Sequence, residues 1–250
     1  MSEKLFLITN DDGYKALGLQ ILAEILAKLG RVVIVAPEIE QSACSHAITL
    51  HSPLRITSLA TDCYAVDGTT TDCVLLASQK LLPTRPDMVF SGINHGPNLG
   101  DDVTYSGTVA GAFEGVLLGV PSVAISSGDA ARIGDKASQE LLSRLIGSLL
   151  EDPWPKDVLL NINLPLSTVP LRGVRITKLG RRHYAESVIE KTDPQGKVYY
   201  WIGGINPQWV GDEDSDFHVV ANGYISVTPL HLDLTHYQSL DGFKTLETIL

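Results

Sequence analysis

Leu5-Phe6-Leu7-Ile8-Thr9-Asn10-Asp11-Asp12-Gly13 is the stretch of sequence that decides the fold. Its first four residues are all apolar, which is the pattern of a β-strand covered on both faces. The Asn-Asp-Asp-Gly that ends the stretch predicts a turn. Leucine and isoleucine then recur at helical spacing from residue 19 to residue 29, and Gly30 supplies a stop for that helix. A buried strand, a turn and an amphipathic helix in this order are the first unit of a parallel α/β sheet.

The same alternation of strand and helix patterns continues through the first 155 residues. Apolar runs predict strands at 32–37, 87–91 and 121–125. Helical spacing predicts helices over 108–118 and from about residue 135 to the prolines at 153 and 155. Strands that alternate with helices favour an α/β core with a mostly parallel sheet.

Beyond residue 155 the pattern changes to strands and hairpins. We predict extended segments at 158–162, 173–179 and 223–230, and a short C-terminal helix with Phe243, Leu246 and Ile249 on one side. Residues 182–202 predict a long hairpin that turns at Asp193-Pro194-Gln195-Gly196. The whole chain, 1–250, is therefore predicted to be a single domain, with a core over 1–155 and a β-rich extension over 156–250. A second subunit commonly covers the edges of such an arm, so we expect a homo-oligomer, although a plain surface hairpin is the alternative.

The composition restricts the class of protein. With 44% hydrophobic and 19% charged residues, the 250-residue chain can bury a sizeable core and is not disordered. No apolar stretch approaches the roughly 18 residues of a membrane-spanning helix. The net charge of −10, from 19 basic and 29 acidic residues, argues against a nucleic acid polymer or an anionic membrane as a partner. A small anionic substrate stays possible.

The N-terminus and the cysteines bear on the cellular compartment. Met1-Ser2-Glu3-Lys4 runs into a short apolar segment that does not have the pattern of a signal peptide. The three cysteines form no CxxC pair, so neither a disulfide framework nor a structural zinc site is indicated. We therefore expect a cytoplasmic protein, and we interpret Cys73 as a small buried apolar residue.

Oxygen-bearing side chains follow three of the predicted strands. Asp11 and Asp12 follow the first strand, Ser42 lies in the loop after the second, and Asn94 follows the strand that ends near Ser91. The carboxyl ends of parallel strands meet at one sheet edge, where ligands bind. Two carboxylates, a hydroxyl and an amide oxygen favour Mg²⁺ or Mn²⁺ over zinc. The alternative is a plain turn in which Asp12 caps the next helix.

A second motif, Ser106-Gly107-Thr108, opens the helix predicted over 108–118 and follows the glycine-rich segment 92–101. Free N–H groups, hydroxyls and the positive end of a helix dipole suit a phosphate. Such turns are usually only structural, so this signal is weak by itself. Combined with a hard-cation site, it makes metal-assisted phosphoryl chemistry plausible. His46 and His95 flank the predicted site and could donate a proton, but a loop histidine is more often a surface group.

Taken together, these motifs resemble those of the SurE (survival protein E) nucleotidases. The matching segments occur in the family's order and cover nearly the whole chain; they are 8–13, 36–37, 41–42, 48–50, 66–69, 72–74, 91–94, 105–109, 161–165 and 226–230. The resemblance implies a Rossmann-like three-layer core and a homodimer or homotetramer. It also implies a cytoplasmic, metal-dependent enzyme that hydrolyses nucleoside 5′-monophosphates, with 3′-nucleotides and short polyphosphate as further substrates. Leu17 and Thr70 depart from the family pattern, which often has proline there.

The resemblance also implies roles for individual residues. Asp11, Asp12, Ser42 and Asn94 would hold one divalent cation per subunit, and Asn98, Ser106, Gly107 and Thr108 would hold the phosphate. As a mechanism hypothesis of our own, we expect direct attack by a water molecule that Asp11 or Asp12 would orient or deprotonate. A covalent aspartyl-phosphate on Asp11 is an alternative mechanism.

Two other classes of protein compete with this prediction. A non-catalytic nucleotide-binding module would keep the glycine-rich turn but release no phosphate. A metal-dependent deacetylase would need imidazole ligands beside Asp11 and Asp12, and no histidine shares a motif with this pair.

Overall fold

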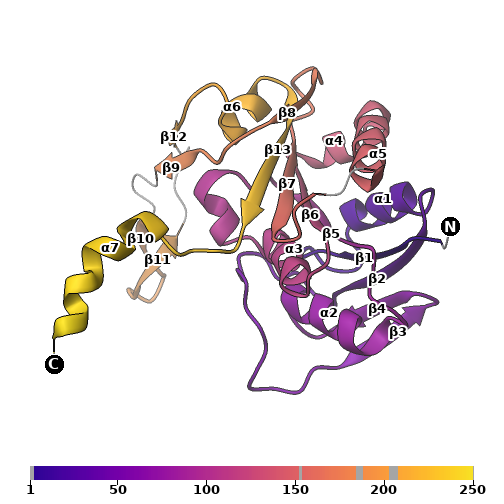
Figure 1. Ribbon diagram of the computed structural model, residues 1–250, viewed down its shortest axis with the longest axis horizontal. Helices are drawn as coiled ribbons and strands as arrows, with labels where there is room; N and C mark the ends of the chain where they lie inside the picture. The colour runs from indigo at the N-terminus through magenta and orange to yellow at the C-terminus, as the bar shows by residue number, and fades with distance from the viewer. Residues whose placement is uncertain (1–2, 152–153, 184–187, 203–207, 250) are drawn as a thin grey trace.

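The structure, a computed structural model, describes residues 3–151, 154–183, 188–202 and 208–249. Within these residues a nine-stranded sheet forms the centre of the molecule (Figure 1). In spatial order its strands are β3 (Ile56–Ala60), β4 (Cys63–Val66), β2 (Arg31–Pro37), β1 (Leu5–Thr9), β5 (Met88–His95), β6 (Ser122–Ser127), β7 (Val158–Leu164), β13 (Tyr224–His231) and β8 (Gly173–Ile176). All neighbouring strands are parallel except β3 with β4 and β7 with β13. The sheet is therefore mostly parallel, as predicted.

Helices cover both faces of the sheet. The first face carries α1 (Leu17–Leu26), α4 (Ala130–Gly134) and α5 (Lys136–Glu151), and the second carries α2 (Thr70–Leu76) and α3 (Gly107–Leu117). The residues of β1 alternate between these faces, because Phe6 and Ile8 pack toward α1 whereas Leu5 and Leu7 pack toward α2. This arrangement confirms the predicted three-layer α/β core.

Strand β1 lies in the middle of the sheet edge that matters for the site, the edge at which neighbouring parallel strands have their carboxyl ends. It is fully flanked, with β2 on one side and β5 on the other, and Thr9 at its end pairs with Ser91 of β5. The chain segments that leave β1, β2 and β5 therefore emerge at the same edge of the sheet.

The sequence patterns did not predict the elements between β2 and β5, which include β3, β4 and α2. Helix α2 begins with a capping box, since the side chain of Thr69 accepts from the N–H of Asp72 and the carboxylate of Asp72 accepts from the N–H of Thr69. The predicted first helix ends at Leu26 rather than at residue 29, and β5 extends beyond the predicted residue 91 to His95.

The extension continues the same sheet and adds an arm. Strands β7, β13 and β8 complete the sheet, and α6 (Asp216–Ala221) leads into β13. The chain leaves the sheet region at β9 (Arg181–His183), which pairs with β12 (Gln208–Val210). In the sequence between β9 and β12, β10 (Val188–Thr192) and β11 (Val198–Ile202) form an antiparallel hairpin. This hairpin confirms the predicted arm, and it stands apart from the sheet in Figure 1.

The C-terminal segment also projects from the body (Figure 1). It consists of α7 (Leu240–Phe243) and a 3₁₀ helix, η4 (Lys244–Thr248). The apolar side chains of Phe243, Leu246 and Ile249 are all exposed. The remaining short elements are the π-helix η1 (Ala77–Leu81) and the 3₁₀ helices η2 (Gly100–Thr104) and η3 (Tyr237–Ser239). In the part of the chain that the structure describes, no helix is both long enough and apolar enough to span a membrane.

Candidate active site

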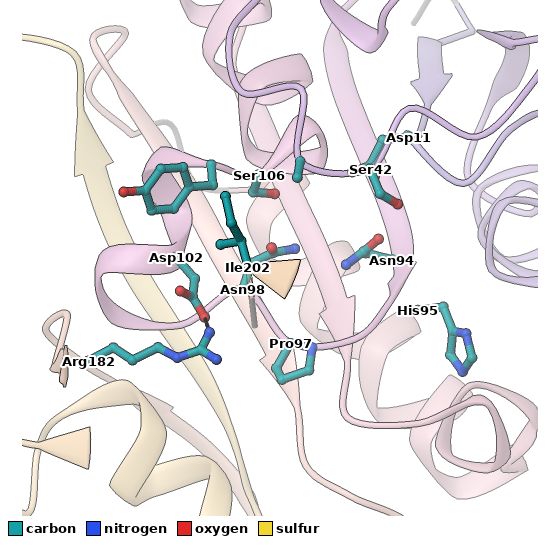
Figure 2. A pocket seen from close by; sticks show the side chains of 12 residues that line it. Asp11, Ser42, Asn94, His95, Pro97, Asn98, Asp102, Ser106, Arg182 and Ile202 are labelled. Atoms are coloured by element: carbon teal, nitrogen blue, oxygen red, sulfur yellow. Dashed lines mark hydrogen bonds and ion pairs between the residues drawn. The ribbon is translucent and has the colours of Figure 1, made fainter. Parts of the chain in front are cut away.

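A pocket of about 680 Å³ opens at the edge where β1, β2 and β5 end. Its volume lies within the range of small-molecule sites. Five of the eight site residues predicted from the sequence line it, namely Asp11, Ser42, Asn94, Asn98 and Ser106. Figure 2 shows Asp11, Ser42 and Asn94 grouped at one end of this pocket.

Asp11 is the most buried acidic group of the pocket. This residue is 4% exposed, and its Oδ1 atom accepts a hydrogen bond from the hydroxyl of Thr108. The pKa of Asp11 is raised to about 6, mainly by burial; the Thr108 bond opposes this rise and the charge of Asp12 adds to it. A divalent cation would offset this unfavourable burial of negative charge.

Asp12 follows Asp11 in the chain but is not one of the residues that line the pocket. It is half-buried, and its Oδ2 atom accepts a hydrogen bond of 3.1 Å from the backbone N–H of His95. Burial raises the pKa of Asp12, an effect that the His95 N–H opposes. Through this bond the end of β1 is joined to the end of β5, so the two acidic residues have a fixed position relative to Asn94.

The loop that carries Ser42 is attached to the same edge. The N–H of Gln41 donates to the backbone oxygen of Asp11 at 2.7 Å. The Ser42 hydroxyl donates to Glu40 at 2.6 Å, while Asn94 Nδ2 donates to the backbone oxygen of Gly96 at 2.8 Å. Because the amide nitrogen of Asn94 is occupied by Gly96, its Oδ1 atom is the one suited to a cation.

Further along, the Ser42 loop is fixed to helices α2 and α3. Ser45 donates its N–H to the backbone oxygen of Tyr105 at 3.0 Å, and the imidazole of His46 pairs with Glu114 at 3.0 Å. Thr49 bonds to Asp72 through both its N–H and its hydroxyl. His46, which we considered as a proton donor, therefore belongs to the attachment of this loop and does not line the pocket.

The Ser106-Gly107-Thr108 turn begins helix α3, as predicted. Ser106 is the N-cap, and its Oγ atom accepts from the N–H of Val109 at 3.0 Å, which leaves its hydroxyl hydrogen available to a ligand. Thr108 is fully buried, and its hydroxyl is used by Asp11. A Cβ atom at Gly107 would lie 2.9 Å from the Asp11 side chain. Gly107 and Thr108 thus lie behind Asp11, and only their backbone N–H groups, in the first turn of the helix, are suited to an anion.

Asn98 is held in the pocket wall by buried polar groups. Its Nδ2 atom and the hydroxyl of Ser126 are 2.7 Å apart, and its backbone contacts side chains of β7. An amide can be turned so that Oδ1 accepts from the Ser126 hydroxyl and the NH₂ group faces the pocket. Asn98 can therefore offer either an acceptor or a donor to a ligand.

Several pocket residues were missed by the sequence reasoning. The polar ones are Asp102 of η2 and Arg182 of β9, and the apolar ones include Tyr105 and Ile202. Asp102 and Tyr105 lie beside the glycine-rich segment and the Ser-Gly-Thr turn, which is a signal that could have identified them. Arg182 and Ile202 lie at the two ends of the predicted hairpin, and no local pattern connects them with the site.

The donor set fits a hard divalent cation. Among the described residues no group of three or more His, Cys, Asp or Glu side chains could hold a metal, so the candidate ligands are mixed. A carboxylate, a hydroxyl and an amide oxygen from Asp11, Ser42 and Asn94 line the pocket, and the second carboxylate belongs to the adjacent Asp12, outside this lining. Oxygen ligands of this kind suit Mg²⁺ or Mn²⁺.

Comparisons with known proteins identify the family of this chain. The model of the family described as "Survival protein SurE" matches residues 6–186. The chain is 48% identical over 241 residues to 5′-nucleotidase SurE of Pelobacter propionicus, with 96% of this chain and 98% of that protein covered. It is 50% identical over 247 residues to 5′-nucleotidase SurE of Gemmatimonas aurantiaca, with coverage of 94% and 95%. The crystal structure of the SurE protein from Aquifex aeolicus superimposes with a TM-score of 0.84 at 42% identity, over 97% of this chain and 99% of that one.

Proposed function

Because the chain belongs to the survival protein SurE family, we propose that it is a metal-dependent 5′-nucleotidase, which hydrolyses nucleoside 5′-monophosphates to a nucleoside and phosphate. The observation that carries this proposal is a single pocket that combines the strand-end oxygens of Asp11, Ser42 and Asn94 with the N-terminus of α3 at Ser106. The oxygens suit a cation and the helix N-terminus suits an anion. Metal-assisted phosphoryl transfer needs a binding site for each of these, one for the metal ion and one for the phosphate.

We propose that Asp11, Asp12, Ser42 and Asn94 hold one divalent cation per subunit, with Mg²⁺ or Mn²⁺ favoured by the all-oxygen ligands. When bound, such an ion neutralises phosphate charge and increases the acidity of a coordinated water. The buried bond from Thr108 supports the role of Asp11, because it fixes the carboxylate in one orientation.

The remaining residues act on the phosphate and the water. The Ser106 hydroxyl, the N–H groups of Gly107 and Thr108, and the Asn98 amide would stabilise charge on the phosphate oxygens. Asp12, the less buried of the two carboxylates, would orient the attacking water and accept its proton. Direct attack by water is favoured over an aspartyl-phosphate on Asp11, since one oxygen of Asp11 is already bonded to Thr108.

The test is phosphate release from a panel of nucleoside monophosphates and short polyphosphate, each assayed with Mg²⁺, Mn²⁺ or EDTA. We expect release that requires the metal and that is lost in Asp12→Asn. The matched control is Asp62→Asn, which removes a partly exposed carboxylate paired with Arg31. This control should keep full activity, because exposed ion pairs contribute little to stability.

Two results would contradict the proposal. Full activity of Asp12→Asn at saturating metal would remove Asp12 from the site. A wild type that binds nucleotides without releasing phosphate with any metal would instead indicate a non-catalytic nucleotide-binding module.

We further propose a cytoplasmic homodimer or homotetramer. The arm exposes several large apolar side chains, including Tyr200 and Trp201, and so does the C-terminal segment. Exposed apolar patches of this kind usually mark a protein interface. Light scattering coupled to size exclusion would give the number of subunits, and a monomer at micromolar concentration would overturn this part of the proposal. Cys44, Cys63 and Cys73 are free thiols, which agrees with a reducing compartment.

A further inference from the structure

At Gly111, one turn beyond Thr108, helix α3 lies against its neighbours with no room for a side chain. Figure 1 shows α3 on the sheet beside α2. A Cβ atom at this position would be 2.7 Å from Cγ2 of Thr70, 2.8 Å from Oγ of Ser91 and 3.1 Å from Cγ2 of Thr9. Non-bonded heavy atoms attract one another best at about 3.5 to 4.0 Å, so these contacts would be repulsive. A side chain here would therefore force α3 and its neighbours apart.

The three neighbours are buried, and one of them is fixed in its orientation. Thr9 of β1 pairs with Ser91 of β5, and both are fully buried. The hydroxyl of Thr70 donates to the backbone oxygen of Asn10 at 3.0 Å, which fixes the rotamer of Thr70 and hence the position of its Cγ2 atom. If Thr70 yields, it pulls on Asn10, which directly precedes Asp11. An added methyl group therefore either lifts α3 or displaces the end of β1.

Both displacements act on the same hydrogen bond, the one from Thr108 to Asp11. Thr108 is fully buried, and its hydroxyl donates to Oδ1 of Asp11. Residues three apart lie on the same side of a helix, so Thr108 and Gly111 both face β1. On the strand side, Thr9 stands two residues before Asp11. The contact at Gly111 and the bond at Thr108 are therefore successive points of one contact between α3 and β1.

From this arrangement we propose that Gly111 is a positioning residue. Because it has no side chain, α3 can lie close to β1, and this closeness holds the Thr108 hydroxyl on Asp11 and the first N–H groups of α3 beside the proposed cation site. The effect on catalysis rests on the proposed function, since it takes Asp11 as a metal ligand and Ser106 as a phosphate ligand. The coupling of Gly111 to the bond between Thr108 and Asp11 does not depend on that function.

The test replaces Gly111 by Ala and measures hydrolysis of a nucleoside 5′-monophosphate with Mg²⁺. We expect kcat/KM to fall about 10- to 100-fold, because the phosphate and the cation are no longer held at the separation that the reaction needs. The loss should be mainly in kcat, since the N–H groups of α3 can still bind the phosphate. A folded Gly111→Ala with the kcat/KM of the wild type would overturn the proposal.

Gly115→Ala is the matched control, one turn further along the same helix. Its Cβ atom would be 2.2 Å from Oγ of Ser122 and 3.0 Å from Cβ of Val89, which pair with each other at the starts of β6 and β5. We expect a comparable fall in the urea midpoint, but a change in kcat/KM of less than about threefold, because this crowding is remote from Asp11. Equal losses of kcat/KM in the two variants would contradict the proposal, since crowding of the helix in general would then explain both.

A compensating variant keeps the test decisive if Gly111→Ala folds poorly. Ser91→Ala and Thr70→Ser remove the two atoms closest to the added methyl group. The Ser91 hydroxyl has no hydrogen-bond partner among the described residues, and Thr70→Ser keeps the hydroxyl that donates to Asn10. Adding Gly111→Ala to this double variant should therefore change its kcat/KM by less than about threefold. A folded triple variant in which the loss persists would contradict the role of close contact at Gly111.

Urea denaturation in EDTA separates this proposal from the proposed function, because it needs neither metal nor substrate. Thr108→Val removes the hydroxyl that donates to Asp11. If Gly111 and Thr108 act on one bond, Gly111→Ala should lower the urea midpoint less in the Thr108→Val background than in the wild type. If the wild type releases no phosphate from any nucleotide, the proposed function fails, whereas this difference still supports the positioning role. Equal falls in the two backgrounds would overturn that role, whatever the activity.

Discussion

The side chain of Asn163 holds both polar backbone atoms of Asn98, although the two residues are 65 positions apart. Asn163 Oδ1 accepts from the N–H of Asn98 at 2.8 Å, and Asn163 Nδ2 donates to the oxygen of Asn98 at 3.0 Å. Asn161 donates to the same oxygen at 2.9 Å. Both asparagines are fully buried on β7. Side-chain amides thus take the place of a neighbouring strand in fixing the loop that carries Asn98.

Replacing Asn163 by Ala should therefore destabilise the protein more than replacing Asn161 by Ala. Asn163→Ala leaves a buried N–H without its acceptor, and we expect a loss of about 2 to 4 kcal/mol in the free energy of unfolding. Asn161→Ala removes one of two bonds to a single oxygen and should cost roughly 1 kcal/mol. Urea denaturation measures both values, and KM for a nucleotide should rise in Asn163→Ala. Equal losses in the two variants would contradict this role of Asn163.

The burial of Asp11 predicts a pH dependence of stability in the absence of metal. The pKa of Asp11 is raised from 3.8 to about 6 in the folded protein, mainly by burial. The folded state therefore binds a proton more tightly than the unfolded state, so its stabilising effect is complete below pH 3.8 and is lost as the pH rises through about 6. At about 1.4 kcal/mol per pKa unit, the loss amounts to roughly 2 to 3 kcal/mol.

Denaturation in EDTA at a series of pH values measures this loss. In Asp11→Asn the decline in stability between pH 4 and pH 7 should be smaller, because the amide does not ionise. Some decline should persist, since burial also raises the pKa of Asp12. An identical pH profile for wild type and Asp11→Asn would show that Asp11 is not the titrating group.

Gly107→Ala should inactivate the protein although it adds only a methyl group. The new Cβ atom would lie 2.9 Å from both Cβ and Oδ2 of Asp11, so the carboxylate must shift. A displacement of this kind at a proposed metal ligand is expected to lower kcat/KM on the order of 100-fold. The control is Gly147→Ala in α5, where nothing lies within 4 Å of the added atom. That variant should keep its activity and gain about 0.5 to 1 kcal/mol of stability.

Asp72 should be important for the loop that carries Ser42. Its carboxylate accepts from the N–H of Thr49 at 2.9 Å, from the Thr49 hydroxyl at 2.6 Å and from the N–H of Thr69 at 2.9 Å. Asp72→Ala removes all three bonds and should cost about 2 to 4 kcal/mol while weakening Mg²⁺ binding severalfold. Thr69→Ser keeps the helix cap and serves as the control, with a change below about 0.5 kcal/mol. Thermal unfolding with and without Mg²⁺ measures both effects, and an unchanged Mg²⁺ affinity in Asp72→Ala would exclude the effect on the loop.

The part of the fold that sequence patterns could predict is the part built from local periodicity. The apolar run at 5–8 and the helical spacing at 19–29 correspond to β1 and α1, and the Pro-Gly turn at 193–196 corresponds to the arm. The end of α1 was less predictable, because Leu29 follows the helical spacing although the helix stops at Leu26. Strand β3 was missed because it is exposed along its whole length and so has no buried face to produce an alternating pattern. Strand β4 has only 4 residues, which are too few for a clear pattern.

The candidate site also has a part that could be predicted from the sequence and a part that could not. Asp11, Ser42 and Asn94 could be brought together by reasoning, because parallel strands share a carboxyl edge. The orientation of Thr108 could not, since its spacing from Ser106 does not reveal that its hydroxyl turns back to Asp11. Arg182 is further from prediction still: its place beside Asp102 depends on the buried bonds of Asp216 to Gly100 and Gly180, which join three distant segments.

The pairing of β9 with β12 has a consequence for how this chain can change over time. The arm leaves the body at Arg181 and returns at Val210, which is the partner of Arg181 in that pairing. Insertions or deletions between these two residues therefore leave the strand registers of the nine-stranded sheet unaltered. Arg182, at one end of the pocket, belongs to this excursion, whereas Asp11 belongs to the sheet edge. Evolution or a protein engineer could thus exchange the arm and alter which molecules are accepted without disturbing the acidic edge on which the chemistry would depend.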